Sequence, residues 1–197
     1  MIKKIIGLCG GSGSGKGTVG KTFSDNGYLV IDTDKVYREL TDTSSPCLIA
    51  LIEEFGREIL NSDGGLDRKK LAAVVFADKK KHTRLNEITH EFVLRRVREI
   101  IALSKDKYCG AVVDAPMLYE SGFDKECDHV IAVICDKETR IERIILRDNI
   151  PREAAIKRIN AQITDAELIS KADFVIENNS CLNSLKSQVD EIIKKVN

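Results

Sequence analysis

The sequence predicts an α/β protein with a five-stranded parallel sheet between layers of helices. Short apolar runs rich in β-branched residues alternate with stretches of helical character, which is typical of parallel sheets. A glycine-rich turn also joins the first of these runs directly to a helical pattern. The expected strands lie at residues 2–8, 28–31, 111–113, 130–134 and 174–176.

The clearest helix is at the C-terminus. Apolar side chains recur at helical spacing between residues 182 and 196, after an Asn-Asn-Ser turn at residues 178–180. We expect this helix to lie on the sheet, because its apolar face has to be buried.

Two insertions separate the expected strands. The first, about residues 35–107, is helical in character and long for a crossover connection, so we expect a helical lobe there. The second, about residues 138–171, is rich in arginine and is expected to form a lid. The remaining segments, about residues 1–34, 108–137 and 172–197, would form the core of a single domain.

The composition is that of an ordinary globular protein. Of the 197 residues, 43% are hydrophobic, and 31 basic residues balance 31 acidic ones. The charge therefore gives no general attraction to nucleic acid or membranes. We expect small-molecule partners, with the chain a monomer or small homo-oligomer.

The six cysteines form no Cys-x-x-Cys pair, so neither a zinc site nor a disulfide framework is indicated. The first apolar run ends in the glycine-rich turn instead of a cleavage site. No run approaches the roughly 20 apolar residues of a membrane span. These observations predict a cytoplasmic protein with reduced thiols.

The glycine-rich turn fits the phosphate-loop pattern G-x-x-x-x-G-K through Gly10, Gly15 and Lys16. Glycines let successive N–H groups face phosphate oxygens, the following helix offers its positive end, and the lysine can reach the β- and γ-phosphates. A turn that binds nothing is the alternative, but the strand-turn-helix context and the lysine favour a phosphate-loop fold. The expected nucleotide-binding residues here are Gly11, Ser12, Gly13, Ser14, Gly15, Lys16, Gly17 and Thr18.

The magnesium ligands are less clear. Gly17 stands where the pattern has a Ser or Thr, and Thr18 is rotated by roughly 100° on a helix, so it is no simple substitute. The same Gly-Lys-Gly-Thr ending resembles adenylate kinases, in which Mg²⁺ is held largely through water. Asp114, after the third strand, either holds a magnesium-bound water or caps a turn before Pro116.

Two carboxylates end the second strand, where open α/β sheets place their ligands. Asp32 and Asp34 would point the same way if the strand continued through both. One of them could then accept the proton of a substrate hydroxyl. The alternative is that Asp32 or Asp34 only caps the next helix.

These motifs together resemble the dephospho-CoA kinase family over nearly the whole chain. The opening matches through the phosphate loop and Val-Ile-Asp-Thr-Asp with Arg38. Later matches follow in order: Phe55-Gly56, Leu66-Asp67-Arg68, Leu71, Phe76, Leu85-Asn86, His90, Pro116-Met117-Leu118-Tyr119-Glu120, Arg140, Arg143, Arg147, Gln162, Ala172-Asp173 and Asn178. The departures are Gly17 for Ser, Met117 for Leu, and Glu91 where Pro is common.

The resemblance implies transfer of phosphate from ATP to the ribose 3′-hydroxyl of dephospho-CoA. Asp34 would be the base, and Asp32 and Arg38 would orient the acceptor. The helical lobe would hold the nucleotide and pantetheine ends, although His90 is equally explained as a hydrogen-bonded helix residue. The further acceptor contacts that the resemblance implies are Asp67, Arg68, Leu118, Glu120 and Arg140.

The spacing of Arg140, Arg143 and Arg147 puts them on one helical face. Such guanidinium groups can neutralise the charge of a phosphoryl group in transfer, and we assign Arg143 to catalysis and Arg147 to the nucleotide. The alternative is a solvated face paired with Glu142 and Asp148. Asn178 would contact the adenine side of ATP, or be only a turn residue.

Two other functions compete with this prediction. Another small-molecule kinase of the same fold, such as a nucleoside or nucleotide kinase, is suggested by the Gly-Lys-Gly-Thr ending. A non-catalytic nucleotide-binding module would be favoured if Lys16 or Asp34 were missing, and both are present.

Overall fold

The computed structural model describes residues 4–76, 78–104 and 107–196. The chain divides into two compact units, one made of Met1–Ile31 with Ser104–Asn197 and the other of Asp32–Leu103. The predicted boundaries of core, lobe and lid stay predictions. In the part of the chain that is described, no helix is long and apolar enough to cross a membrane.

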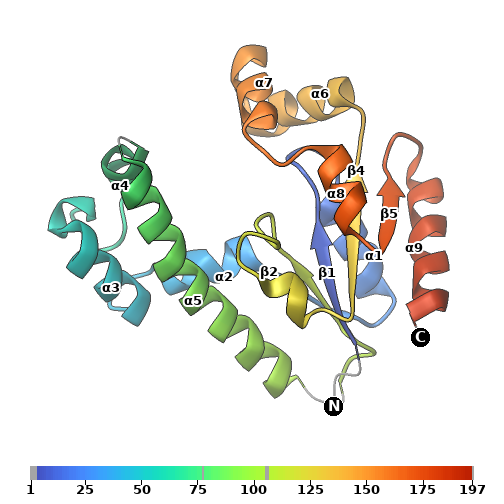
Figure 1. Cartoon of the computed structure of the whole chain (residues 1–197), viewed down its shortest axis with the longest axis horizontal. Coiled ribbons are helices and arrows are strands. Elements are labelled where there is room, and N and C mark those ends of the chain that lie inside the picture. The colour runs from blue at the N-terminus through green and yellow to red at the C-terminus, as the bar shows by residue number, and fades with distance from the viewer. Residues whose placement is uncertain (1–3, 77, 105–106, 197) are drawn as a thin grey trace. The chain divides into compact units, whose positions relative to one another are not determined.

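The first unit is built on a five-stranded sheet with the strand order β2-β3-β1-β4-β5 (Figure 1). Strand β1 pairs in parallel with β3 and β4, and β4 pairs in parallel with β5. The predicted α/β class is therefore confirmed. The strands are β1 (Ile5–Cys9), β2 (Leu29–Asp32), β3 (Ala111–Asp114), β4 (His129–Ile134) and β5 (Phe174–Glu177).

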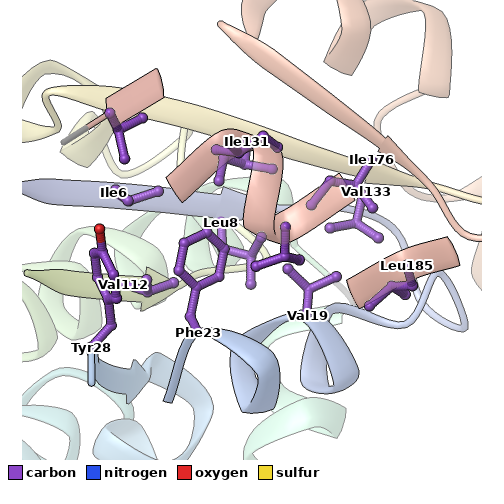
Figure 2. Close-up of a cluster of buried hydrophobic side chains, with 13 residues drawn as sticks. Ile6, Leu8, Val19, Phe23, Tyr28, Val112, Ile131, Val133, Ile176 and Leu185 are labelled. Atoms are coloured by element: carbon purple, nitrogen blue, oxygen red, sulfur yellow. The ribbon is translucent and has the colours of Figure 1, made fainter. Parts of the chain in front are cut away.

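Helices α1 (Lys16–Asp25) and α9 (Leu182–Val196) pack on each other and on the sheet. Figure 2 shows the core between them, in which Leu8 and Phe23 are fully buried. The rings of Phe23 and Tyr28 meet edge to face, with centroids 5.2 Å apart. Burying such side chains contributes about 1.5–3 kcal/mol each. This core therefore holds β1 and α1 together next to the turn that connects them.

Three more helices follow the fourth strand: α6 (Lys137–Asp148), α7 (Arg152–Asn160) and α8 (Asp165–Lys171). Helices α6 and α7 lie beyond the carboxyl end of β4 (Figure 1). They share a small core of their own, in which Ile141, Ile144 and Ala155 are fully buried. A short 3-10 helix, η2 (Phe123–Glu126), connects β3 to β4.

Apart from an isolated antiparallel bridge between Leu60 and Leu66, the elements described in the second unit are helices. Its long helix α5 packs against α2, α3 and α4, around a separate core that includes Leu48, Leu51 and Ile59. The Ser45 hydroxyl accepts a hydrogen bond from the Leu48 N–H and so caps α3. The elements are α2 (Thr33–Leu40), α3 (Pro46–Phe55), η1 (Arg57–Ile59), α4 (Arg68–Phe76) and α5 (Lys79–Leu103).

Candidate active site

The phosphate-loop motif forms the turn between β1 and α1. Gly13 and Gly15 have φ angles of +78° and +98°, a region that L side chains rarely adopt. Gly15 is the N-cap of α1, and within the described residues no side chain caps this helix and no acidic residue lies in its first turn. The positive end of α1 is therefore available to an anion.

Side chains that come after β4 and β5 in the chain donate hydrogen bonds to the backbone of this loop. Three consecutive carbonyls each accept one hydrogen bond: Ser12 O from Arg140 Nε at 2.9 Å, Gly13 O from Arg143 Nη1 at 3.3 Å, and Ser14 O from Asn178 Nδ2 at 2.8 Å. In a planar trans peptide the C=O and the next N–H point in opposite directions. The N–H groups that follow these carbonyls therefore point away from the three side chains.

The close approach of these side chains also explains the glycines. A Cβ on Gly11 would lie 2.0 Å from Arg140 Nη2, and a Cβ on Gly15 would lie 2.0 Å from Asn178 Nδ2. A Cβ on Gly13 would lie 2.7 Å from the carbonyl oxygen of Arg140. Neighbouring protein atoms thus leave no space for a Cβ at these three positions unless they shift.

Lys16 is the first residue of α1, and its Nζ lies 3.7 Å from Oδ1 of Asp114 at the end of β3. Both side chains are largely buried. Next to it, a Cβ on Gly17 would meet nothing within 4 Å, and Thr18 is exposed. The lysine and the carboxylate therefore sit together at the carboxyl edge of the sheet, beside an open surface of α1.

The second strand does not continue through Asp34, and the alternative that Asp32 caps the next helix is the one found. Strand β2 ends at Asp32, whose Oδ1 accepts hydrogen bonds from the N–H groups of Asp34 at 2.9 Å and Lys35 at 3.1 Å. Asp32 is the N-cap of α2, because its carboxylate satisfies two N–H groups that have no partner inside the helix. Asp34 and Arg38 are both exposed, one helical turn apart on α2.

The predicted acceptor residues of the second unit do not all have free side chains. Asp67 Oδ1 accepts hydrogen bonds from the N–H groups of Lys69 and Lys70 at the start of α4. Arg68 Nη2 donates to Thr41 Oγ1 at 3.1 Å, and its guanidinium lies over the Tyr37 ring, 5.8 Å from the centroid. Burial raises the pKa of the Tyr37 hydroxyl, so this ring is neutral.

Three other predicted site residues differ in exposure. His90 is half-buried on α5, and Glu120 is exposed. Leu118 is fully buried, and its Cδ2 would lie only 2.8 Å from a Cβ on Gly7. This position favours a packing role for Leu118 over the predicted contact with substrate.

The three arginines of α6 differ from one another. Arg140 is 4% exposed, its Nη1 pairs with Asp165 at 3.1 Å and its Nε donates to Ser12 O, so its hydrogen bonds connect it to the phosphate loop. Arg143 Nη2 donates to the carbonyl of Asn178 at 3.3 Å. Of these three guanidinium groups, all in the described part of the chain, that of Arg147 is mostly exposed.

Arg147 shows features of both alternatives for this helix face, a contact with the phosphate loop and a solvated ion pair. Its Nη2 is 3.4 Å from Ser12 Oγ, while its Nε pairs with Asp148 at 2.7 Å. Hydrogen bonds from Arg147 and then Arg158 lower the pKa of the Asp148 carboxyl to about 2. A solvated ion pair and a contact with the phosphate loop thus occur on the same side chain.

Sequence reasoning missed two residues that hold this loop. Gln162 Oε1 accepts the N–H of Ser12 at 2.9 Å and Arg140 Nη2 at 3.3 Å, and Asp165 pairs with the same arginine. Gln162 was part of the family pattern but had no role assigned. For Asp165 the sequence offered no indication, because its partner lies 25 positions away.

Known proteins match this chain along nearly its whole length. The family model for dephospho-CoA kinase matches residues 4–184. The dephospho-CoA kinases of Fusobacterium nucleatum and Corynebacterium glutamicum are 42% and 38% identical over 196 and 200 residues, each covering 100% of both chains.

Solved structures are similar over the same length. A protein from Thermus thermophilus has a TM-score of 0.85 at 27% identity, covering 100% of both chains. Dephospho-CoA kinase from Campylobacter jejuni has a TM-score of 0.70 at 26% identity, covering 98% of this chain and 96% of that one. From the match along its whole length, we conclude that the chain belongs to the dephospho-CoA kinase family.

Proposed function

We propose that this protein is an ATP-dependent dephospho-CoA kinase, which transfers the γ-phosphoryl group of ATP to the ribose 3′-hydroxyl of dephospho-CoA. The products would be CoA and ADP, as in the last step of CoA synthesis. The observation that carries the proposal is the family match over residues 4–184, which includes the phosphate loop and the whole helical unit.

The loop and α1 would bind the triphosphate of ATP. Their contribution is electrostatic: glycine N–H groups, the positive helix end and the Lys16 ammonium all favour negative charge. Charge that spreads over the phosphoryl oxygens during transfer would be stabilised by Arg143 and Arg147, which already lie against this loop. Asn178 would contribute by holding the loop itself.

The residues present fit a magnesium ion that is bound mostly through water and phosphate oxygens. Mg²⁺ in such kinases usually takes only one or two carboxylates from the protein. The Asp114 carboxylate beside Lys16 and the exposed Thr18 hydroxyl are the oxygen donors here. They would hold Mg²⁺, which when bound neutralises charge on the phosphates.

Asp34 is our candidate for the base that takes the proton of the 3′-hydroxyl. It is exposed in the first turn of α2, and the Asp32 cap holds its N–H and fixes this turn. Arg38 would orient the acceptor one helical turn further on, and Asp67, Arg68, His90 and Glu120 would contribute further acceptor contacts.

The composition and the family membership support inferences about partners, cellular location and oligomeric state. We infer small-molecule substrates and no nucleic-acid or membrane partner, because basic and acidic residues balance at 31 each. We further infer a cytoplasmic monomer or small homo-oligomer.

An acceptor panel tests the proposal. Purified protein with ATP and magnesium would be offered dephospho-CoA, adenosine, AMP, pantetheine and shikimate, with ADP release as the readout and mass spectrometry to identify the product. We expect turnover with dephospho-CoA and a product heavier by one phosphoryl group. Turnover confined to AMP or a nucleoside would reject the proposal.

A further inference from the structure

Three hydrogen bonds close a ring around Ser12 in the phosphate loop. The Ser12 N–H donates to Gln162 Oε1 at 2.9 Å, and Arg140 Nη2 donates to the same oxygen at 3.3 Å. Arg140 Nε donates in turn to the Ser12 carbonyl at 2.9 Å. Both backbone polar groups of Ser12 are therefore held by two side chains that also bond each other.

The ring is anchored by an ion pair, and its arginine is buried. Arg140 Nη1 pairs with Asp165 at 3.1 Å, so each guanidinium nitrogen has a protein acceptor. Arg140 is only 4% exposed and lies directly against Gly11. Three of its five N–H donors are engaged, and its burial leaves little open surface for contact with a phosphoryl oxygen.

We propose that Gln162 and Arg140 are positioning residues for the nucleotide: they fix the phosphate loop through Ser12 and strengthen nucleotide binding without touching the nucleotide. This inference rests on the proposed function only in taking the loop as the site of ATP. It assigns Arg140 to the loop, where the sequence suggested the acceptor.

The physical reason is conformational entropy. A loop that carries glycine at four of its six positions between β1 and α1 has more backbone freedom than other sequences, and ordering it on binding costs affinity. A ring that orders Ser12 beforehand removes part of this cost. Because Gln162 lies between α7 and α8, the ring also ties the phosphate loop to the segment that follows α6 and α7.

The test exchanges the hydrogen-bonding chemistry of Gln162 while keeping its size and the local charge. Gln162→Met removes the acceptor oxygen. The double variant Gln162→Glu with Asp165→Asn keeps an acceptor oxygen at both positions and leaves the net charge unchanged. Gln188→Met is the matched control, since Gln188 bonds the backbone of Glu177 and not the loop.

Binding of ADP by calorimetry is the main readout, with the thermal midpoint and the KM for dephospho-CoA measured alongside. We expect Gln162→Met to weaken ADP binding about tenfold, the effect of losing about one net hydrogen bond. The double variant should bind ADP within about twofold of the wild type, as should Gln188→Met. The KM for dephospho-CoA should stay unchanged in all three.

Two outcomes would overturn the inference. Unchanged ADP binding by Gln162→Met would mean that the ring does not support the nucleotide site. A double variant that binds ADP no better than Gln162→Met would mean that the amide group of Gln162 contacts the nucleotide itself. Absence of turnover with dephospho-CoA while ADP still binds would instead reject the proposed function and leave this result standing.

Discussion

The side-chain nitrogen of Asn178 lies 2.8 Å from the main-chain oxygen of Ser14, so the residue after the last strand holds the loop after the first. Asn178 is only 8% exposed, and the backbone of Gly15 lies directly against its amide. Its own carbonyl accepts hydrogen bonds from Arg143 Nη2 and from the Cys135 thiol. Asn178 is thus a structural neighbour of the phosphate loop and more than a turn residue.

Asn178→Asp should weaken ATP binding about tenfold or more, because a carboxylate oxygen would face the Ser14 carbonyl where a donor is needed. The measurement is the KM for ATP at saturating acceptor. Asn179→Asp is the control: it adds the same charge one residue away, where the side chain bonds Asp136 instead of the loop. Equal losses in the two variants would point to charge alone and contradict the tether.

Lys16→Met should raise the KM for ATP and lower kcat, because the ammonium that favours the phosphates is lost. The stem of the side chain remains, so the change is mainly one of charge. Steady-state kinetics with varied ATP measures both effects. Lys21→Met on the same helix removes an exposed lysine that pairs with Asp25, and it should behave as wild type; a Lys16 variant that does the same would remove the phosphate-loop assignment.

Asp34→Asn should lower kcat by at least about 10²-fold while ATP binding stays nearly intact, since a general base contributes about 10²–10⁴ in rate. Rapid-quench measurement of the phosphoryl-transfer step, with ADP binding measured separately, separates the two effects. Asp42→Asn is a control in the same unit, where an exposed carboxylate accepts the N–H of Thr43. Undiminished transfer by the Asp34 variant would end its role as base.

Much of the fold could be predicted because its evidence is local. Each of the five strands lies within a few residues of its predicted range, since short apolar runs between helical stretches carry that information. The site was harder. Strand β2 ends at Asp32 because its side chain caps α2, and an acidic residue after an apolar run is compatible with either outcome.

The contacts that hold the phosphate loop could not be predicted from local pattern. Arg140, Gln162 and Asn178 are 128 to 164 positions from their loop partners, and their orientation depends on how α6 and β5 pack. The Arg140 spacing correctly indicated one helical face with Arg143 and Arg147. The spacing could not indicate that this arginine is buried against Gly11 and forms an ion pair with Asp165.

Gly11→Ala tests that close approach by stability alone. The new methyl group would lie 2.0 Å from Arg140 Nη2, and the guanidinium cannot move without breaking its three hydrogen bonds. We expect a loss of about 1–3 kcal/mol in the free energy of unfolding, as for other overpacked sites. Gly17→Ala is the comparison, because a Cβ there meets nothing within 4 Å and alanine favours the helix. Denaturant titration of both should show only the first destabilised.

The cysteines should differ in reactivity, because thiolate formation follows their surroundings. Burial raises the pKa of Cys9 and Cys47 to about 11 and of Cys127 to about 12, so these remain thiols at neutral pH. Backbone N–H groups of Ser184 and then Asn183, at the start of α9, lower the pKa of the exposed Cys181 thiol.

A lowered pKa means that the thiolate of Cys181 is already present at a pH where an ordinary cysteine is still protonated. Its alkylation by iodoacetamide should therefore begin at lower pH than that of a model cysteine peptide, and at neutral pH it should precede that of Cys9, Cys47 and Cys127. Peptide mapping by mass spectrometry after timed labelling measures the rates. Earlier labelling of a buried cysteine would contradict the burial that the structure gives these side chains, and a Cys181 profile identical to the peptide would contradict the effect of the α9 terminus.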